Sequence, residues 1–563
     1  MAKKEDAPDG LRLDRRNFLR TTGSVGLAET IAAPVKLVAQ SKVLPILGGG
    51  LLCLEQPLQA SEPSPVAETA QGRARGASVE GVHIYRGIPY AGPTSGKARF
   101  LPPAKPEKHV GVRDATITGP RCVQGPGNIF LGPVIGEYFG GGRPDRVELA
   151  RQVNSEDCLN LNILTPGLRG KRAVMVYIHG GGLNSGSSAL TLFSDRFVRE
   201  QNVVLVGVNH RLSVFGYTYL GGLNPKYQMG NVGQLDLVAA LEWIRENISH
   251  FGGDPANVTI FGESGGGAKI SALLAMPAAK GLFHKACVQS GSALRVPDAD
   301  QGTKAARQLL ENLGLTESQL DRLNDIPPDK LLAAGNRGGA AGRIVLDGRS
   351  LLHQTWDSGA PAESAGVPMI VGDDKDEGTL FARDPALFVL NDAGLRSQLI
   401  KANIPESGVD SILGIYRRDH PSESPTDLYF RISTDRGARH NAARQAELKT
   451  AQGKANVYVY YCQWNTPLTQ DGHKINSFHT SDLPLTMRLV RFPESEQLSR
   501  QLSGAWAAFA RTGNPSQKEL FWPAYTSERR TTMVFDGSHS GAVDDPNRDE
   551  RLALLKFPSG GLL

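Results

Sequence analysis

Between Ala256 and Ala268, an apolar and β-branched run leads into a serine flanked by glycines. The segment is Ala-Asn-Val-Thr-Ile-Phe-Gly-Glu-Ser264-Gly-Gly-Gly-Ala, and an apolar stretch from Ile270 to Met276 follows it and is expected to begin a helix. Strand, G-x-S-x-G and helix in this order predict a sharp turn that lifts the Ser264 hydroxyl above the edge of a sheet. Ser264 is therefore the candidate nucleophile.

A phosphate-binding loop is the other structure that so much glycine could indicate. The spacing from Gly262 to Gly267 fits such a loop, but Ala268 stands where its lysine must follow and Lys269 comes one residue late. The sequence therefore favours the nucleophile turn.

A second glycine-rich turn follows the apolar run Val174–Ile178 and reads His179-Gly180-Gly181-Gly182. Glycines after a strand leave backbone N–H groups unhindered, and an ester carbonyl that becomes an oxyanion needs two or three such donors. We assign Gly181, Gly182 and the N–H of Gly265 to this oxyanion hole. His179 is expected to brace the loop rather than to act as the catalytic base.

The apolar runs predict an α/β fold with a large, mostly parallel sheet. Five runs are short, continuously apolar and bounded by turn residues, as buried parallel strands are: Ala173–Ile178, Val203–Val208, Val258–Phe261, Met369–Val371 and Val457–Tyr461. The clearest helical pattern spans residues 234–249, and residues 303–341 indicate helical insertions. Although 563 residues exceed the usual size of a domain, no linker divides the chain after about residue 75.

Charge and hydropathy exclude two classes of partner. The 62 basic and 57 acidic residues nearly balance, so no concentrated basic face for nucleic acid is expected. After residue 60 no apolar run approaches the roughly 20 residues that span a bilayer, so no stable membrane insertion is expected.

The first sixty residues are predicted to be an export signal. Arg15 and Arg16 precede Phe18-Leu19 and a basic Arg20, which is typical of the bacterial twin-arginine signal, and a weakly apolar segment follows. The alternative to an export signal is an ordinary helix that begins with basic residues. The predicted organisation is a signal region at 1–60, a flexible segment at 61–80 and one domain at 81–563, located in the periplasm or secreted.

The cysteines agree with an oxidising compartment. Cys287 and Cys462 lie in apolar runs and are expected to be buried thiols, whereas Cys122 and Cys158 lie in polar surroundings rich in proline and glycine. A disulfide between the latter two would brace a long loop.

The motifs taken together resemble the type-B carboxylesterases, the family of para-nitrobenzyl esterases, mammalian carboxylesterases and cholinesterases. The resemblance runs from Gly81 to about Phe535, and its motifs follow one another in the family's order. Besides the two glycine turns they are Tyr85–Ala91, Arg99–Pro103, Ser155–Asn162, Asn209–Leu212, Gly230–Asp236, Phe251–Pro255 and Trp506–Pro515. The resemblance implies an α/β-hydrolase fold and a serine ester hydrolase that needs no cofactor and no metal.

The resemblance also completes a catalytic triad. It places the acid in an Asp-Glu-Gly turn, matched by Asp376-Glu377-Gly378, and the base in a motif matched by His479-Thr-Ser-Asp-Leu-Pro484. Pattern alone does not choose between Asp376 and Glu377; the resemblance chooses Glu377. A calcium-binding loop is excluded because Gly378 does not have the spacing of an EF-hand.

The chain departs from the family at four positions. Gly265 replaces the usual alanine, which is not expected to affect a backbone donor, and His210 replaces a tyrosine. Thr480 and Asp482 replace a glycine and a glutamate and could reshape the rim of the site. The resemblance to the family also implies a disulfide between Cys122 and Cys158.

The expected activity is hydrolysis of small to medium organic esters through an acyl-enzyme on Ser264. Two alternatives stay open: a lipid-ester, thioester or amide hydrolase with the same triad, and a non-catalytic adhesion-type relative. The adhesion-type proteins lose a triad residue, and this chain keeps all three. A cholinesterase is disfavoured because no tryptophan lies between Cys122 and Cys158 to bind choline. The oligomeric state is left open.

Overall fold

The structure is a computed structural model, and it describes residues 62–125, 136, 138–139, 152–537 and 539–557. The chain divides into two units, Met1–Leu58 and Gln59–Leu563, and the described residues belong to the second. The predicted twin-arginine segment lies outside the described residues.

Among the described residues, thirteen strands form one sheet, in the order β1-β2-β3-β7-β9-β8-β10-β11-β12-β13-β16-β17, with β4 beside β2. Two further pairs, β5 with β6 and β14 with β15, lie apart from it. The strands of the large sheet are β1 (Glu62–Thr69), β2 (Gly72–Val79), β3 (Val82–Pro89), β4 (Val112–Asp114), β7 (Asn160–Thr165), β8 (Arg172–Ile178), β9 (Val204–Val208), β10 (Gly253–Glu263), β11 (Lys285–Gln289), β12 (Met369–Asp374), β13 (Val457–Cys462), β16 (Thr531–Phe535) and β17 (Gly541–Asp544). The small pairs are β5 (Arg121–Cys122), β6 (Asn154–Ser155), β14 (Thr469–Gln470) and β15 (His473–Lys474).

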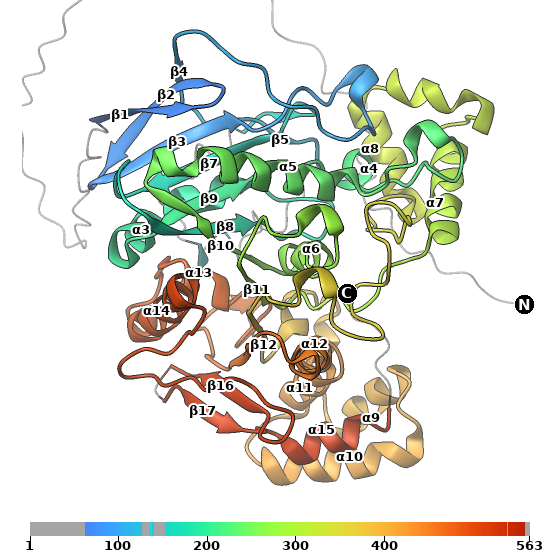
Figure 1. The fold of residues 1–563 in the computed structure, drawn as a ribbon. Coiled ribbons are helices and arrows are strands. Elements are labelled where there is room, and N and C mark those ends of the chain that lie inside the picture. Colours follow the sequence, from blue (N-terminus) through green and yellow to red (C-terminus); the bar gives the residue numbers. More distant parts are fainter. Residues whose placement is uncertain (1–61, 126–135, 137, 140–151, 538, 558–563) are drawn as a thin grey trace, which may run out of the picture. The chain divides into compact units, whose positions relative to one another are not determined.

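The middle of the large sheet is parallel and its ends are antiparallel (Figure 1). Strands β9, β8, β10, β11, β12, β13 and β16 pair in parallel. Strands β1, β2, β3, β7 and β9 pair antiparallel in succession at one end, and β17 pairs antiparallel with β16 at the other. The short β4 pairs in parallel with β2. Parallel neighbours present their carboxyl ends at one edge, which is where open α/β sheets place their ligands.

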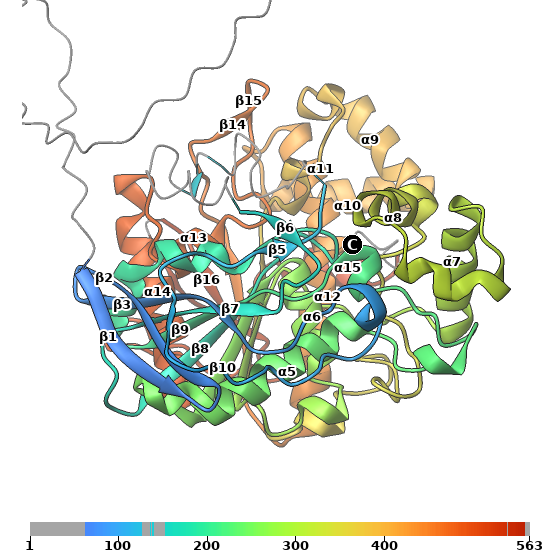
Figure 2. The ribbon, with the colours of Figure 1, turned by 90° about the horizontal axis from the view of Figure 1, so that it is seen from above.

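The α-helices lie on both faces of the sheet, as the view from above shows (Figure 2). Helices α5, α6 and α12 pack into the core on one face, and α3, α13 and α14 into the core on the other. The described α-helices are α3 (Asp195–Gln201), α4 (Ser213–Gly216), α5 (Val232–Asn247), α6 (Gly265–Leu273), α7 (Ala299–Asn312), α8 (Pro328–Asn336), α9 (Asp392–Lys401), α10 (Glu406–Asp419), α11 (Pro425–Arg436), α12 (Ala438–Gln452), α13 (Asp482–Thr486), α14 (Glu496–Thr512) and α15 (Arg548–Leu554).

Strand β8 shows how one apolar run fills both cores. Val174, Val176 and Ile178 join the core under α5 and α6, and the alternate residues Met175 and Tyr177 join the core under α14. Successive side chains of a strand point to opposite faces, so a strand buried on both faces must be continuously apolar. This explains why the five predicted runs all fold as strands.

Two expectations need adjustment. Residues 61–80 were expected to be flexible, but Glu62–Thr69 and Gly72–Val79 fold as the first two strands of the sheet. The helix after Ser264 begins at Gly265 rather than at Ile270, so the glycines form its first turn. No helix among the described residues is long and apolar enough to cross a membrane.

Candidate active site

Four of the predicted functional segments follow strands at the same edge of the parallel sheet. The glycine loop with Gly181 follows β8, Ser264 follows β10, Glu377 follows β12 and His479 lies in the segment after β13. Since β8, β10, β12 and β13 are parallel and separated only by β11 between β10 and β12, the fold brings these residues to one place.

Ser264 occupies the strained corner between β10 and α6. Its φ of 57° and ψ of −125° lie in a region that residues with a side chain rarely adopt. The Ser264 N–H donates to the Gln289 carbonyl at 2.8 Å, and its own carbonyl accepts from Ala268 N–H at 3.0 Å. These two bonds hold the turn from both sides.

The two glycine turns touch through their backbones. A Cβ atom added to Gly265 would lie 2.1 Å from the Gly182 carbonyl oxygen, and Gly181 and Gly182 have φ values of 82° and 60° that favour glycine. Gly265 is the first residue of α6, so its N–H has no acceptor within the helix. The three predicted donors therefore belong to one small region.

Glu377 and His479 are in direct contact. Oε2 of Glu377 meets Nδ1 of His479, and Oε1 of Glu377 accepts from Asp374 N–H at 3.0 Å. The Glu377 N–H in turn donates to Thr434 Oγ1 at 3.1 Å. Both oxygens of the Glu377 carboxylate thus have hydrogen-bond partners, and the His479 imidazole is held through Nδ1.

Asp376, the neighbouring carboxylate, points elsewhere. Its Oδ2 pairs with Lys375 Nζ at 2.8 Å and accepts from Ser477 N–H at 3.2 Å. Its backbone forms a single parallel bridge with Phe478, which sets Glu377 opposite His479. The structure therefore selects Glu377 as the partner of the imidazole.

The other imidazole nitrogen faces Glu263, the residue directly before Ser264. His479 Nε2 lies 3.2 Å from Glu263 Oε1, but the two do not have hydrogen-bond geometry. Within the described part of the chain, Nε2 has no hydrogen-bond partner. It therefore makes no hydrogen bond with the Ser264 hydroxyl. Catalytic hydrogen bonds are often long before substrate binds. Sequence reasoning did not single out Glu263.

Buried carboxylates control the charge of His479. Burial alone would lower the pKa of His479, but the charges of Glu263 and Glu377, the hydrogen bond with Glu377 and the charge of Asp482 raise it to about 9. Asp482 is fixed at Oδ2 by the Tyr460 hydroxyl at 2.6 Å and by Gln289 Nε2 at 2.8 Å.

Thr480 and Asp482 were expected to reshape the rim, and this expectation is wrong. Thr480 is 1% exposed and Asp482 is fully buried, so both lie inside the protein. Thr480 has a φ of 80°, a backbone conformation that suits glycine and strains a β-branched residue. The two exchanges therefore act on the support of His479.

The four cysteines among the described residues are buried, and the predicted disulfide is not formed. Cys122, Cys158, Cys287 and Cys462 are free thiols in the structure. Cys122 and Cys158 are nevertheless neighbours that share a hydrogen bond. This bond, together with burial, raises the pKa of the Cys158 thiol well above its ordinary value. Their pairing stays a prediction.

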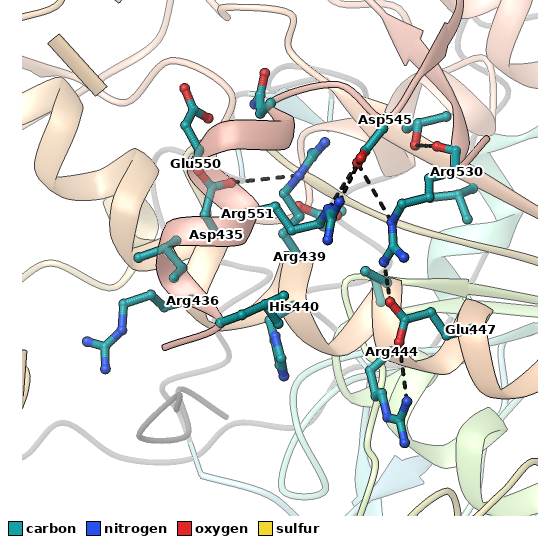
Figure 3. Close-up of a pocket in the computed structure, with 18 of the residues that line it drawn as sticks. Asp435, Arg436, Arg439, His440, Arg444, Glu447, Arg530, Asp545, Glu550 and Arg551 are labelled. Carbon is teal, nitrogen blue, oxygen red and sulfur yellow. Dashed lines mark hydrogen bonds and ion pairs between the residues drawn. The ribbon is translucent and has the colours of Figure 1, made fainter. Parts of the chain in front are cut away.

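A cavity of about 480 Å³ lies away from these residues, between α12, β16 and α15 (Figure 3). Charged side chains line it and pair with one another: Arg551 contacts Asp545 at 2.6 Å, and Arg530 contacts Glu447. None of Ser264, Glu377 and His479 lines this cavity.

A serine at a strand–helix corner, a carboxylate–histidine pair and a cluster of glycine N–H groups, at one edge of this sheet, define an α/β-hydrolase. The chain belongs to the carboxylesterase family, which matches residues 63–554. It is a serine carboxylic ester hydrolase, as its relatives are.

Three relatives illustrate the likeness. A para-nitrobenzyl esterase of Bacillus subtilis (strain 168) is 36% identical over 519 residues, covering 88% of this chain and 99% of that protein. A liver carboxylesterase of Sus scrofa is 34% identical over 529 residues, covering 83% of this chain and 89% of that protein. The solved structure of a Geobacillus stearothermophilus carboxylesterase superposes with a TM-score of 0.72 at 34% identity, over 87% of this chain and 99% of that one.

Proposed function

We propose that Ser264, Glu377 and His479 are the catalytic triad of this esterase and that the N–H groups of Gly181, Gly182 and Gly265 form its oxyanion hole. The observation that carries this proposal is the contact of Glu377 with His479 Nδ1, which leaves Nε2 beside the residue that precedes Ser264. The chain order of serine, acid and histidine is that of the α/β-hydrolases.

In the proposed reaction, His479 Nε2 takes the proton of the Ser264 hydroxyl as the oxygen attacks the ester carbonyl. Glu377 keeps the other imidazole nitrogen protonated and stabilises the imidazolium that forms. The three glycine N–H groups hold the oxyanion, and the imidazolium then gives its proton to the leaving alcohol. Water, activated by the same histidine, hydrolyses the acyl-enzyme and restores the serine.

The proposed substrates are small to medium organic esters. A relative named para-nitrobenzyl esterase and one named liver carboxylesterase support this class. Phe381 adds an apolar ring against His479, with 4.9 Å between the ring centroids and 40% of the side chain exposed. Kinetics on esters of graded acyl and alcohol size, with one amide and one thioester for comparison, would identify the preferred leaving group.

One variant and one label test the nucleophile. Ser264→Ala should lose about 10⁴-fold or more in turnover of an activated ester, and a serine-directed phosphonate should label Ser264. Ser290→Ala is a matched control, because Ser290 is a buried serine that, like Ser264, has a positive φ and directly follows a strand, the neighbouring β11. Labelling at another residue, or near-normal activity of Ser264→Ala, would overturn the assignment.

We further propose export through the twin-arginine signal at Arg15 and Arg16, with a disulfide between Cys122 and Cys158 in the mature enzyme. The paired arginines before Phe18-Leu19 support the first proposal, and the proximity of the two thiols supports the second. Replacing both arginines with lysine should keep active enzyme in the cytoplasm. An unchanged periplasmic fraction would contradict the export proposal.

A further inference from the structure

Lys269 is a buried lysine in α6 for which the triad has no use. Its side chain is fully buried, and its Nζ donates to the His179 carbonyl at 2.9 Å. Burial lowers the pKa of Lys269 to about 7. Among the described residues, no salt bridge joins it to a carboxylate. Because a buried ammonium without a counter-ion is costly, the position needs an explanation.

The His179 carbonyl, which accepts the hydrogen bond from Lys269, belongs to the first residue of the oxyanion loop, His179–Gly182. Each of the first three carbonyls of this loop contacts a different group. The His179 carbonyl is held by Lys269. The Gly180 carbonyl lies 3.0 Å from Nδ1 of His179, and the Gly181 carbonyl accepts from Ser185 N–H at 3.1 Å.

These three contacts fix the loop's donors. The peptide unit is planar and trans, so a carbonyl held in one direction points the next N–H the opposite way. The N–H groups of Gly180, Gly181 and Gly182 are therefore oriented through their carbonyl partners. Within the described chain, none of the hydrogen bonds uses the N–H of Gly181 or Gly182.

Helix geometry explains how Lys269 reaches the loop. Helical side chains lean toward the N-terminus of their helix, and the first turn of α6 packs on the end of β8: a Cβ added to Gly266 would lie 2.1 Å from the Ile178 carbonyl oxygen. A long side chain one turn later, leaning back, meets the next carbonyl, which belongs to His179.

Of Lys269, His179 and His210, Lys269 is the group that can carry a positive charge near neutral pH. His179 stacks on His210 with 4.5 Å between ring centroids. Burial and the charge of Lys269 together lower the pKa of His179 to about 3, and the same two causes lower that of His210 well below its ordinary value. Both imidazoles are therefore neutral at ordinary pH.

We propose that Lys269 is a positioning residue of the oxyanion hole: it fixes the peptide unit between His179 and Gly180, which directly precedes the peptide units that carry the Gly181 and Gly182 donors, and in its protonated form its charge favours the developing oxyanion. This inference rests on the proposed function of that loop. In the sequence alone, Lys269 is notable only because it comes one residue too late to be the lysine of a phosphate-binding loop.

A merely structural lysine is the competing explanation, and the chain offers a matched control. Lys449 in α12 is also fully buried, and its Nζ donates to the carbonyls of Ser364 and Ala365 and to Gln452 Oε1. Burial lowers its pKa to about 8. It contacts no residue of the proposed site.

The experiment compares Lys269→Met with Lys449→Met in the full-length enzyme. For each we would measure kcat and KM on para-nitrophenyl acetate, thermal stability, and inhibition by a trifluoromethyl ketone, which adds to the serine as an oxyanion. The corresponding secondary alcohol serves as a ligand that forms no oxyanion.

Lys269→Met should lose about 10–100-fold in kcat with KM within about twofold, and bind the ketone more weakly by a similar factor. Its affinity for the alcohol should be unchanged. Lys449→Met should lower thermal stability and leave kcat and ketone binding as in the wild type. Should Lys269→Met fail to fold, Lys269→Leu, which likewise removes both the donor and the charge, gives the same comparison.

A Lys269 variant with reduced stability but wild-type kcat and ketone affinity would overturn the inference. That result differs from a failure of the proposed function, in which the wild-type enzyme itself would not bind the ketone at Ser264.

Discussion

The Glu263 carboxylate lies 3.2 Å from Nε2 of His479, on the residue immediately before Ser264. The imidazole thus has one carboxylate at each nitrogen, Glu377 at Nδ1 and Glu263 at Nε2. Because Nε2 must be free to accept the serine proton, an ionised Glu263 opposes the reaction by stabilising the protonated imidazole. Burial raises the pKa of Glu263 well above its ordinary value, and the charge of His479 lowers it.

Replacing Glu263 with glutamine should therefore move the acid limb of activity to lower pH. The Glu263 charge is one of those that raise the pKa of His479 to about 9, and a group with a lower pKa becomes a free base at a lower pH. We expect the acid limb of kcat/KM to shift by about one pH unit or more. Asp376→Asn, whose carboxylate faces Lys375, is the control. An unchanged limb in Glu263→Gln would show that Glu263 does not set this pKa.

Glu377→Gln should be crippled in turnover, and Asp376→Asn should not. Glutamine keeps the shape of Glu377 but loses the charge that stabilises the imidazolium, so we expect kcat to fall about 10³–10⁴-fold. Asp376→Asn removes an ion pair with Lys375 and should mainly lower stability, with kcat within about tenfold of wild type. Measuring kcat and thermal unfolding for both on one ester decides the matter, since the reverse ranking would place the acid one residue earlier.

Gly265→Ala should reduce turnover although the backbone donor remains. The added Cβ would lie 2.1 Å from the Gly182 oxygen and 2.5 Å from its carbonyl carbon, both backbone atoms. The oxyanion loop must therefore move, and we expect kcat to fall about tenfold or more. Gly414→Ala in α10, where nothing lies within 4 Å of the new Cβ, should leave kcat unchanged. A wild-type kcat for Gly265→Ala would contradict this prediction and show that the oxyanion loop accommodates the added Cβ without loss of catalysis.

Peptide mapping without reductant should find Cys122 joined to Cys158 in exported enzyme, with Cys287 and Cys462 free. The bond closes a long loop, so reducing it should lower the free energy of unfolding by about 2–4 kcal/mol. The same mapping on enzyme kept in the cytoplasm should yield free thiols. Four free thiols in the exported material would reject the pairing.

The parallel core of the fold was predictable because burial on both faces leaves a simple trace in the sequence. Each of the five predicted strands is continuously apolar, and each is found in the structure as β8, β9, β10, β12 or β13. Strands β1 and β2 were not predicted, since their residues are small, polar or charged and several are exposed, as the edge position of β1 permits.

From local pattern alone, the candidate site was predictable where a turn imposes glycine and not where contacts join distant segments; Glu377 and His479 were predicted only through the family resemblance. The corner at Ser264 and the Gly181–Gly182 turn need particular residue types at fixed spacing. The choice of Glu377 over Asp376 follows from a bridge between Asp376 and Phe478, and the roles of Glu263 and Lys269 follow from contacts with His479 and His179. Such pairings across the fold leave no local pattern.

The carbonyl-held loop from His179 to Gly182 also bears on how such enzymes diversify. Its restraints come from α6 and from residues within a few positions of the loop itself. The segment between β11 and β12, which holds α7 and α8, supplies none of the three carbonyl contacts. Mutations in that segment can therefore accumulate over generations while the inherited geometry of the loop is retained.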